Sequence, residues 1–218
     1  MNENQFLERT VPGLHEALTQ AMPNFSYDTP ILDIGCGTGA WLERLAGQGF
    51  YCLHGIDQDL TQFQTKKATC SSANLDYDDL GLGEQKFGLI TAIEVIEHLE
   101  NPGRLFYHVD RHLQPKGYFL ITTPNIHSVG CRLRFLLTGN LKSFDAKGDP
   151  THIYPVLLPA LNRVLPRYNL KIVNKWGYPS KGSLISRKST QLITAIMELI
   201  LPNPDPGDTL CLLIQKVE

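Results

Sequence analysis

A glycine-rich turn directly after a short apolar run constrains this chain more than any other feature. Residues 31–39 read Ile-Leu-Asp-Ile-Gly-Cys-Gly-Thr-Gly, and an amphipathic stretch, Ala40–Gly47, follows. Glycine at alternate positions permits positive φ angles and removes the Cβ atoms that would hold a ligand away from the backbone. A helix after the turn would direct its free N–H groups and the positive end of its dipole toward that ligand. The pattern predicts a strand–turn–helix unit with a large polar ligand lying across the turn.

Runs that suit strands alternate with helical patterns along the rest of the chain. The predicted strands are 31–34, 51–56, 69–75, 87–93, 118–122, 170–176 and 209–217, and the predicted helices are 6–22, 40–46, 60–68, 102–113, 154–165 and 189–201. Such alternation predicts an α/β fold, a parallel sheet with helices on both faces. The length of 218 residues suits one domain, 1–218, with a leading helix within 5–22. The pattern breaks after Pro124, which predicts an insertion of about 125–152 that forms a substrate cap.

Composition places the chain among globular proteins. Hydrophobic residues make up 42% and charged residues 19%, which excludes a disordered chain. The densest apolar run, Leu192–Leu201, is ten residues long, whereas a helix needs about 20 to cross a bilayer. The first residues do not resemble a signal peptide. Five cysteines without a C-x-x-C pair suit free thiols in a reducing compartment, not a zinc site. We therefore expect a cytoplasmic protein.

The net charge of −2 conceals a basic C-terminal half. Residues 111–197 contain thirteen Lys and Arg against only Asp145 and Asp149. This surface is either a solvated basic face or one that meets an anionic partner, such as a phosphorylated acceptor or a membrane surface. Nucleic acid is disfavoured as a partner, because the overall charge is slightly negative and no basic, aromatic platform is evident. The oligomeric state is left open.

Two acidic segments narrow the identity of the ligand. Asp57 ends the second predicted strand, twenty residues after Gly37, where a carboxylate can accept hydrogen bonds from both hydroxyls of a ribose. Asp57 could instead cap the next helix. From Phe87 the chain reads Phe-Gly-Leu-Ile-Thr-Ala-Ile-Glu-Val-Ile-Glu-His-Leu-Glu-Asn-Pro, which places acids and His98 beyond a strand end, where open parallel sheets bind ligands. Dehydrogenases favour G-x-G-x-x-G and an apolar residue where Asp33 stands.

Together, the Asp33–Gly39 turn, Asp57, the Glu94–His98 segment and Pro115–Gly117 resemble the class I S-adenosylmethionine-dependent methyltransferases. Residues 30–125 are most similar to the branch that carries Glu-Val-Ile-Glu-His-Leu after its fourth strand. Ubiquinone-pathway O-methyltransferases and small-RNA 2′-O-methyltransferases share that branch. The resemblance implies a Rossmann-like, seven-stranded, mostly parallel sheet whose last strand is antiparallel. It also implies S-adenosyl-L-methionine as the cofactor.

By the same resemblance, the cofactor lies against the glycine turn and the ends of the neighbouring strands. The expected cofactor-binding residues are Asp33, Gly35, Cys36, Gly37, Gly39, Asp57, Gln58, Asn74, Leu75, Ile93 and Glu94. Asp33 flanks the amino-acid portion, Asp57 holds the ribose, and Asn74 lies beside the adenine. The family usually has an acid where this chain has Asn74, but an amide can also accept from the adenine amino group.

Methyl transfer to oxygen requires removal of a proton from the acceptor. His98 is the first candidate catalytic base and His152 the second. His98 could instead brace a turn, and His152 could be an exposed loop residue. Glu94 and Glu97 with the two histidines also resemble the divalent-cation site of the small-RNA enzymes. The same segment occurs in relatives with no known metal, so no metal is assigned and the cation site is kept as an alternative.

The sequence therefore predicts an enzyme, an S-adenosylmethionine-dependent methyltransferase that acts by in-line displacement on a small-molecule acceptor, at oxygen. We expect the leading helix and the insertion to determine the acceptor, which is anionic or lipophilic. The segment Val129–Leu141 either caps the site or rests on lipid as a peripheral membrane contact. Two other classes stay open. One is a catalytically silent adenosyl-binding partner subunit, and the other, a nicotinamide-dependent oxidoreductase, lacks an evident Tyr-x-x-x-Lys.

Overall fold

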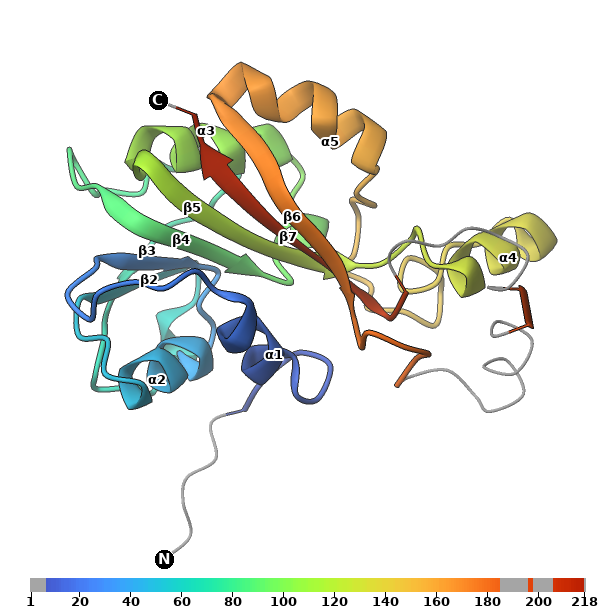
Figure 1. Ribbon diagram of the computed structural model, residues 1–218, viewed down its shortest axis with the longest axis horizontal. Coiled ribbons are helices and arrows are strands. Elements are labelled where there is room, and N and C mark those ends of the chain that lie inside the picture. The colour runs from blue at the N-terminus through green and yellow to red at the C-terminus, as the bar shows by residue number, and fades with distance from the viewer. Residues whose placement is uncertain (1–6, 185–195, 198–205, 218) are drawn as a thin grey trace, which may run out of the picture.

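A seven-stranded sheet forms the centre of the computed structural model, which describes residues 7–184, 196–197 and 206–217 (Figure 1). The strands are β1 (Ile31–Ile34), β2 (Leu53–Asp57), β3 (Thr69–Ser72), β4 (Phe87–Ile93), β5 (Leu113–Pro124), β6 (Leu170–Tyr178) and β7 (Thr209–Lys216). Their order is β3-β2-β1-β4-β5-β7-β6. The first five pair in parallel, whereas β7 runs antiparallel to both β5 and β6. The predicted α/β sheet with an antiparallel last strand is confirmed.

Helices cover both faces of this sheet (Figure 1). The α-helices are α1 (Leu14–Ala21), α2 (Ala40–Gly47), α3 (Pro102–His112), α4 (Val129–Thr138) and α5 (Leu158–Val164), and short 3-10 helices are η1 (Leu60–Gln62), η2 (Ile96–His98) and η3 (Leu165–Tyr168). Successive strand residues point to opposite faces. Ile31 packs in the cluster that holds α1 and α2, and Leu32 packs in the cluster that holds α3 and α5.

The helix predicted over 60–68 is wrong beyond its first turn. Only η1 forms, and the Asp59 carboxylate caps it by accepting from the backbone N–H of Thr61. The chain then runs against the glycine turn. The Gln64 N–H donates to the Thr38 carbonyl, and the Thr65 hydroxyl donates to the Glu43 carboxylate. These tertiary contacts outweigh the local helical pattern.

The leading helix is shorter than predicted. It begins at Leu14, because Pro12 precedes Gly13, which has a φ of 80° at the N-cap. Residues 7–13 form an extended and turned segment instead. The helix predicted over 154–165 likewise begins only at Leu158. Most of the helix predicted over 189–201 lies outside the described residues.

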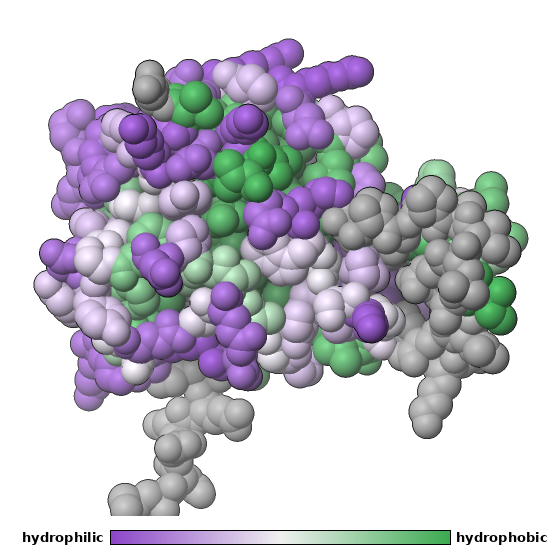
Figure 2. Space-filling view, viewed as in Figure 1, coloured by the Kyte–Doolittle hydropathy of each residue, from purple (hydrophilic) through white to green (hydrophobic). Residues whose placement is uncertain are grey.

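The insertion after β5 differs from the expected cap. Its helix α4 projects beyond the end of β5, away from α1 and α2 (Figure 1). Val129 and Cys131 are buried, whereas Phe135, Leu136 and Leu137 are exposed. Figure 2 shows hydrophobic side chains at the edge of the molecule where α4 lies, and the rest of this face mixes hydrophilic and hydrophobic patches. Among the described residues, no helix is long and apolar enough to cross a bilayer.

Candidate active site

A cavity of about 740 Å³ opens at the carboxyl ends of the central strands. Strand β1 lies between β2 on one side and β4 on the other, so the chain leaves β1 in one direction and returns past it to reach β4. This reversal opens a crevice at the strand ends, the place where open α/β sheets bind ligands. The cavity is lined by the ends of β1, β2 and β4, by the N-terminal segment, and by the loops that contain residues 73–76 and 149–152.

The glycine turn forms the floor of this cavity. Gly35, Gly37 and Gly39 have φ angles of 75°, 50° and 80°. A Cβ added at Gly35 would lie 2.5 Å from a Val95 methyl carbon, so the turn packs too closely for a side chain there. A Cβ added at Gly37 would meet no described atom within 4 Å and would project into open space. The turn therefore leaves room for a ligand against bare backbone at Gly37.

Two carboxylates flank the turn in different environments. Asp57 accepts from the backbone N–H of Gly37 at 2.8 Å and from that of Asp59 at 3.0 Å, so it is fixed against the turn. Asp33 is buried and accepts from the Thr91 hydroxyl at 2.6 Å. Burial raises the pKa of Asp33 to about 7, although the Thr91 hydrogen bond acts in the opposite direction. Asp57 thus lies at the edge of the cavity as an acceptor that a ribose could use, and Asp33 lies beside the turn.

Residues that follow β2 and β3 form the side of the cavity where we expect the adenine. Gln58, Asn74 and Leu75 all line it. The Asn74 amide lies 3.5 Å from the Gln58 side-chain oxygen, and the Asn74 backbone N–H donates to Asp78 at 2.8 Å. Every predicted cofactor residue except Gly39 lines the cavity. Gly39 is instead the N-cap of α2, where an added Cβ would lie 2.6 Å from the Thr65 methyl carbon.

His98 and His152 lie together in the cavity wall, apart from the residues that follow β2 and β3. Their ring centroids are 4.7 Å apart. The His98 Nδ1 lies 2.8 Å from the Thr151 hydroxyl, which donates its one proton to Asp149 at 2.6 Å. The His98 Nδ1 must therefore be the donor, which leaves a lone pair on Nε2. The His152 Nδ1 lies 3.0 Å from the Ser143 carbonyl, so the same reasoning assigns its lone pair to Nε2.

This wall joins segments that are far apart in sequence. The Glu97 carbonyl accepts from the backbone N–H groups of Ile153 and Tyr154, at 2.8 and 2.9 Å, and so fixes the end of the insertion beside η2. Burial lowers the pKa of His98, and the charge of His152 adds to this effect. A neutral His98 is the form that can accept a proton.

Two carboxyl groups, half-buried Glu94 and buried Glu97, belong to the same segment as His98. Glu94 has a φ of 54° and accepts from the Thr122 hydroxyl at 2.9 Å. Burial raises the pKa of Glu94 to about 7. Burial and then the charge of Glu94 raise the pKa of Glu97 well above its usual range. Neither Glu97 oxygen has a hydrogen-bond partner of normal geometry within the described chain.

Glu97, His98 and His152 also meet the distance requirement for a metal site, because one ligand atom from each lies within 4.8 Å of the others. Two imidazoles and a carboxylate suit Zn²⁺, Mn²⁺ or Fe²⁺. The unpartnered Glu97 oxygens fit such an ion. Glu94, the fourth residue of the predicted cation site, is not part of this group.

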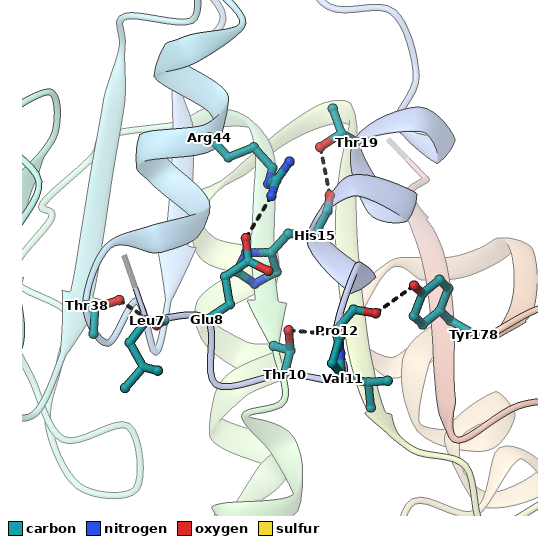
Figure 3. A network of polar contacts seen from close by, with 10 residues as sticks. All are labelled: Leu7, Glu8, Thr10, Val11, Pro12, His15, Thr19, Thr38, Arg44 and Tyr178. Atoms are coloured by element: carbon teal, nitrogen blue, oxygen red, sulfur yellow. Dashed lines mark hydrogen bonds and ion pairs between the residues drawn. The ribbon is translucent and has the colours of Figure 1, made fainter. Parts of the chain in front are cut away.

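The segment 7–13 covers the cavity from the N-terminal side, a contribution that the sequence indicated only in outline. Figure 3 shows its anchors: the Thr38 hydroxyl donates to the Leu7 carbonyl, Arg44 pairs with Glu8 at 2.8 Å, and the Tyr178 hydroxyl donates to the Pro12 carbonyl. These contacts tie it to the glycine turn, α2 and β6. The residues from this part of the chain that line the cavity are Leu7, Glu8, Arg9, Thr10, Val11 and His15.

The insertion contributes less to the cavity than predicted. Asp149, Thr151 and His152 line the cavity, whereas no residue of α4 does. The expected cap is therefore limited, among the described residues, to the last turn of the insertion.

Comparisons with known proteins agree with this geometry. A family model described as a methyltransferase domain matches residues 5–175. A ubiquinone biosynthesis O-methyltransferase of Rickettsia conorii is 30% identical over 116 residues, which cover 50% of this chain and 40% of the relative. That of Pasteurella multocida is 30% identical over 112 residues, which cover 44% of this chain and 46% of the relative. The chain thus spans less than half the length of these two relatives.

Solved structures share the fold at low identity. An S-adenosylmethionine-dependent methyltransferase from Mesorhizobium loti superposes with a TM-score of 0.60 at 20% identity, covering 92% of this chain and 96% of that one. Another from Archaeoglobus fulgidus gives a TM-score of 0.62 at 20% identity, covering 93% of each chain. With the family match over most of its length, this chain belongs to the class I S-adenosylmethionine-dependent methyltransferases.

Proposed function

We propose that this chain transfers a methyl group from S-adenosyl-L-methionine to an oxygen atom of a small-molecule acceptor. The observation that carries the proposal is the hydrogen-bonded series from His98 through Thr151 to Asp149, which lines the same cavity as the glycine turn. The relatives from Rickettsia conorii and Pasteurella multocida are O-methyltransferases, which agrees with an oxygen acceptor.

The cofactor, when bound, supplies a methyl group on a positively charged sulfur and leaves as a neutral thioether. The chain therefore has no leaving group to protonate. Its glycine turn and Asp57 hold the donor, and positioning of the acceptor against that donor contributes up to roughly 7–11 kcal/mol. His98 accepts the acceptor proton on Nε2, while Thr151 and Asp149 keep Nδ1 protonated and stabilise the cation that forms.

A metal-assisted form of the same reaction is the second candidate. The unpartnered oxygens of buried Glu97 and the Nε2 lone pairs of His98 and His152 favour it. A divalent ion held there would polarise the acceptor hydroxyl and lower its pKa. Activity measured with and without a chelator separates the two forms. Full activity in the presence of chelator would indicate that His98 alone removes the acceptor proton. Activity that is lost in chelator and regained with Mn²⁺ or Zn²⁺ would indicate that a metal ion assists this step.

Labelling tests the proposed function directly. The protein is incubated with a small-molecule extract and a donor that carries a deuterated methyl group, and mass spectrometry then identifies labelled products. We expect labelled methyl ethers or esters that are absent with the variant His98→Asn. The variant His54→Asn is the matched control, since His54 bonds Thr69 and Ser71 on β3, outside the cavity.

Two outcomes would contradict the proposal. Label on nitrogen or carbon would overturn the oxygen acceptor. Tight donor binding with no labelled product in extracts rich in hydroxylated metabolites would favour a silent adenosyl-binding subunit.

A further inference from the structure

A second group of imidazoles lies outside the cavity, between α3 and the segment 73–86 that precedes β4. His108 and His112 are one helical turn apart on α3, and both side chains are fully buried. Asp79 approaches them from the exposed part of the segment. One ligand atom from each of the three residues lies within 4.8 Å of the others. None of the three lines the cavity.

The hydrogen bonding of His112 determines which ring nitrogen is free. Its Nδ1 lies 3.0 Å from the Gln85 carbonyl, which can only accept. Nδ1 therefore carries the proton, and the lone pair is on Nε2. That Nε2 is buried and has no hydrogen-bond partner within the described chain. Metal-ligating histidines commonly donate their other nitrogen to a carbonyl in this way.

The surroundings of His108 are more unusual than those of His112. Its side chain is fully buried, and neither ring nitrogen has a hydrogen-bond partner of normal geometry among the described residues. Buried polar groups are nearly always partnered in native proteins. Residues four apart share one face of a helix, so His108 and His112 present their rings side by side. The surrounding positions of α3, Leu105 and Val109, are apolar core residues.

We propose that Asp79, His108 and His112 bind a transition-metal ion of the Zn²⁺ class, outside the active site. Two neutral imidazoles and one carboxylate match the ligands that zinc takes, and solvent can complete the coordination on the exposed side of Asp79. The Asp79 Oδ2 also pairs with Arg111 at 2.9 Å. The backbone N–H groups of Leu80 and Gly81 also donate to this carboxylate, and such partners orient a carboxylate that binds a metal.

The ion would hold the segment 73–86, which forms one wall of the cofactor cavity, against α3. The segment 73–86 carries Asn74, Leu75 and Asp76, which line the cavity, and its Leu80 and Leu82 pack into the core beside α3. Asp76 already accepts from the Asn101 N–H at 2.7 Å, at the start of α3. A metal near the other end of α3 would attach the segment to this helix at a second point, Asp79. The expected role is structural, so this inference does not depend on the proposed reaction.

Zinc binding by the full, untagged chain tests the proposal. The double variant His98→Asn/His152→Asn serves as the background, because it removes the imidazoles of the active-site group. After metal removal and dialysis against Zn²⁺, mass spectrometry should find one zinc ion per folded chain, and added Zn²⁺ should raise the thermal unfolding midpoint. Adding His112→Gln should abolish both effects. Asp79→Asn should weaken binding by about tenfold or more, whereas Glu84→Gln, in the same segment, should leave it unchanged.

The proposal fails if the folded background protein binds no zinc. It fails equally if binding persists in both His112→Gln and Asp79→Asn. Should His112→Gln not fold, Asp79→Asn decides, because Asp79 is exposed and its replacement keeps the side-chain shape.

Discussion

The two sides of the cavity are built on different principles. The donor side consists of strand ends and a tight turn, and its positions are set by backbone: three positive φ angles, the Gly37 N–H on Asp57, and parallel pairing of β1 with β2. The side that we propose for the acceptor consists of segments 7–13 and 149–154, which reach the cavity from distant parts of the sequence. Side-chain bonds and the Glu97 carbonyl hold them. Donor binding and acceptor chemistry should therefore fail separately when each side is altered.

The largest effect is expected at His98. Replacement His98→Asn removes the group that takes the acceptor proton and should lower kcat by about 10²- to 10⁴-fold, with donor affinity unchanged. Steady-state kinetics together with calorimetry of donor binding measure both quantities. A loss of donor binding as large as the loss of kcat would contradict the division between the two sides.

Asp57→Ala should produce the opposite pattern. It removes the acceptor of the Gly37 and Asp59 N–H groups and the candidate ribose ligand. A hydrogen bond to a charged group contributes about 1.5–3 kcal/mol, so donor affinity should fall by about 10- to 100-fold. Asp59→Ala, which changes the neighbouring exposed acid, is the control. An unchanged dissociation constant for Asp57→Ala in calorimetry would place the ribose elsewhere.

Thr151 is a positioning residue, and its replacement should have a smaller effect. Thr151→Val cuts the connection from His98 to Asp149 and should lower kcat by about tenfold, while the KM for the donor stays constant. Thr151→Ser keeps the hydroxyl and should restore most of kcat. Equal losses in the Val and Ser variants would indicate a purely structural role.

Buried Asp33 makes stability depend on pH. Its pKa is about 7 in the folded chain against 3.8 for an unperturbed group, so the unfolded chain loses this proton first. Protonated Asp33 therefore contributes to the free energy of unfolding in full below about pH 4, and this contribution is lost as the pH rises through about 7. Without ligand, the thermal midpoint should fall more steeply between these values in the native chain than in Asp33→Asn. Parallel curves for the two proteins would contradict the raised pKa.

The smallest effect is expected at the anchor of segment 7–13. Arg44→Met breaks the partly exposed pair with Glu8 and should cost less than about 1 kcal/mol of unfolding free energy. It should raise the KM for the acceptor a few-fold. Lys67→Met, which breaks the pair of Lys67 with Glu43 on the same helix, is the control. A larger change in donor affinity than in acceptor KM would assign the segment to the donor side.

The difference between features that are encoded locally and contacts between distant segments explains what could be predicted from the sequence. The bounds of β1 and β4 agree with the predicted ones, because short apolar runs next to glycine or acid signals encode them locally. The glycine turn, Asp57 and the Asn74 region could be placed because each lies at a strand end, and parallel strands bring their carboxyl ends to one edge.

Contacts between segments that are distant in sequence could not be predicted in the same way, although His98 and His152 could be named as site residues. Nothing near Glu8 indicates that Arg44 will pair with it, and nothing near residues 60–68 indicates that Phe63 and Thr65 will pack on Gly39. The helix α4 has a local helical pattern, but its direction depends on contacts that the pattern does not contain. The same holds for Asp79, which meets His108 and His112 only after α3 docks on the sheet.

Calorimetric titration of S-adenosyl-L-methionine into the native chain and into Gly37→Ala tests the central claim most directly. A methyl group at position 37 projects into open space and meets no described atom within 4 Å, so its only cost to the free chain is the backbone strain of an alanine at a φ of 50°. We expect heat and a one-to-one complex with the native chain, and a folded Gly37→Ala protein whose donor affinity is at least about tenfold weaker. Absence of binding to the folded native chain, or equal binding to both proteins, would contradict the account.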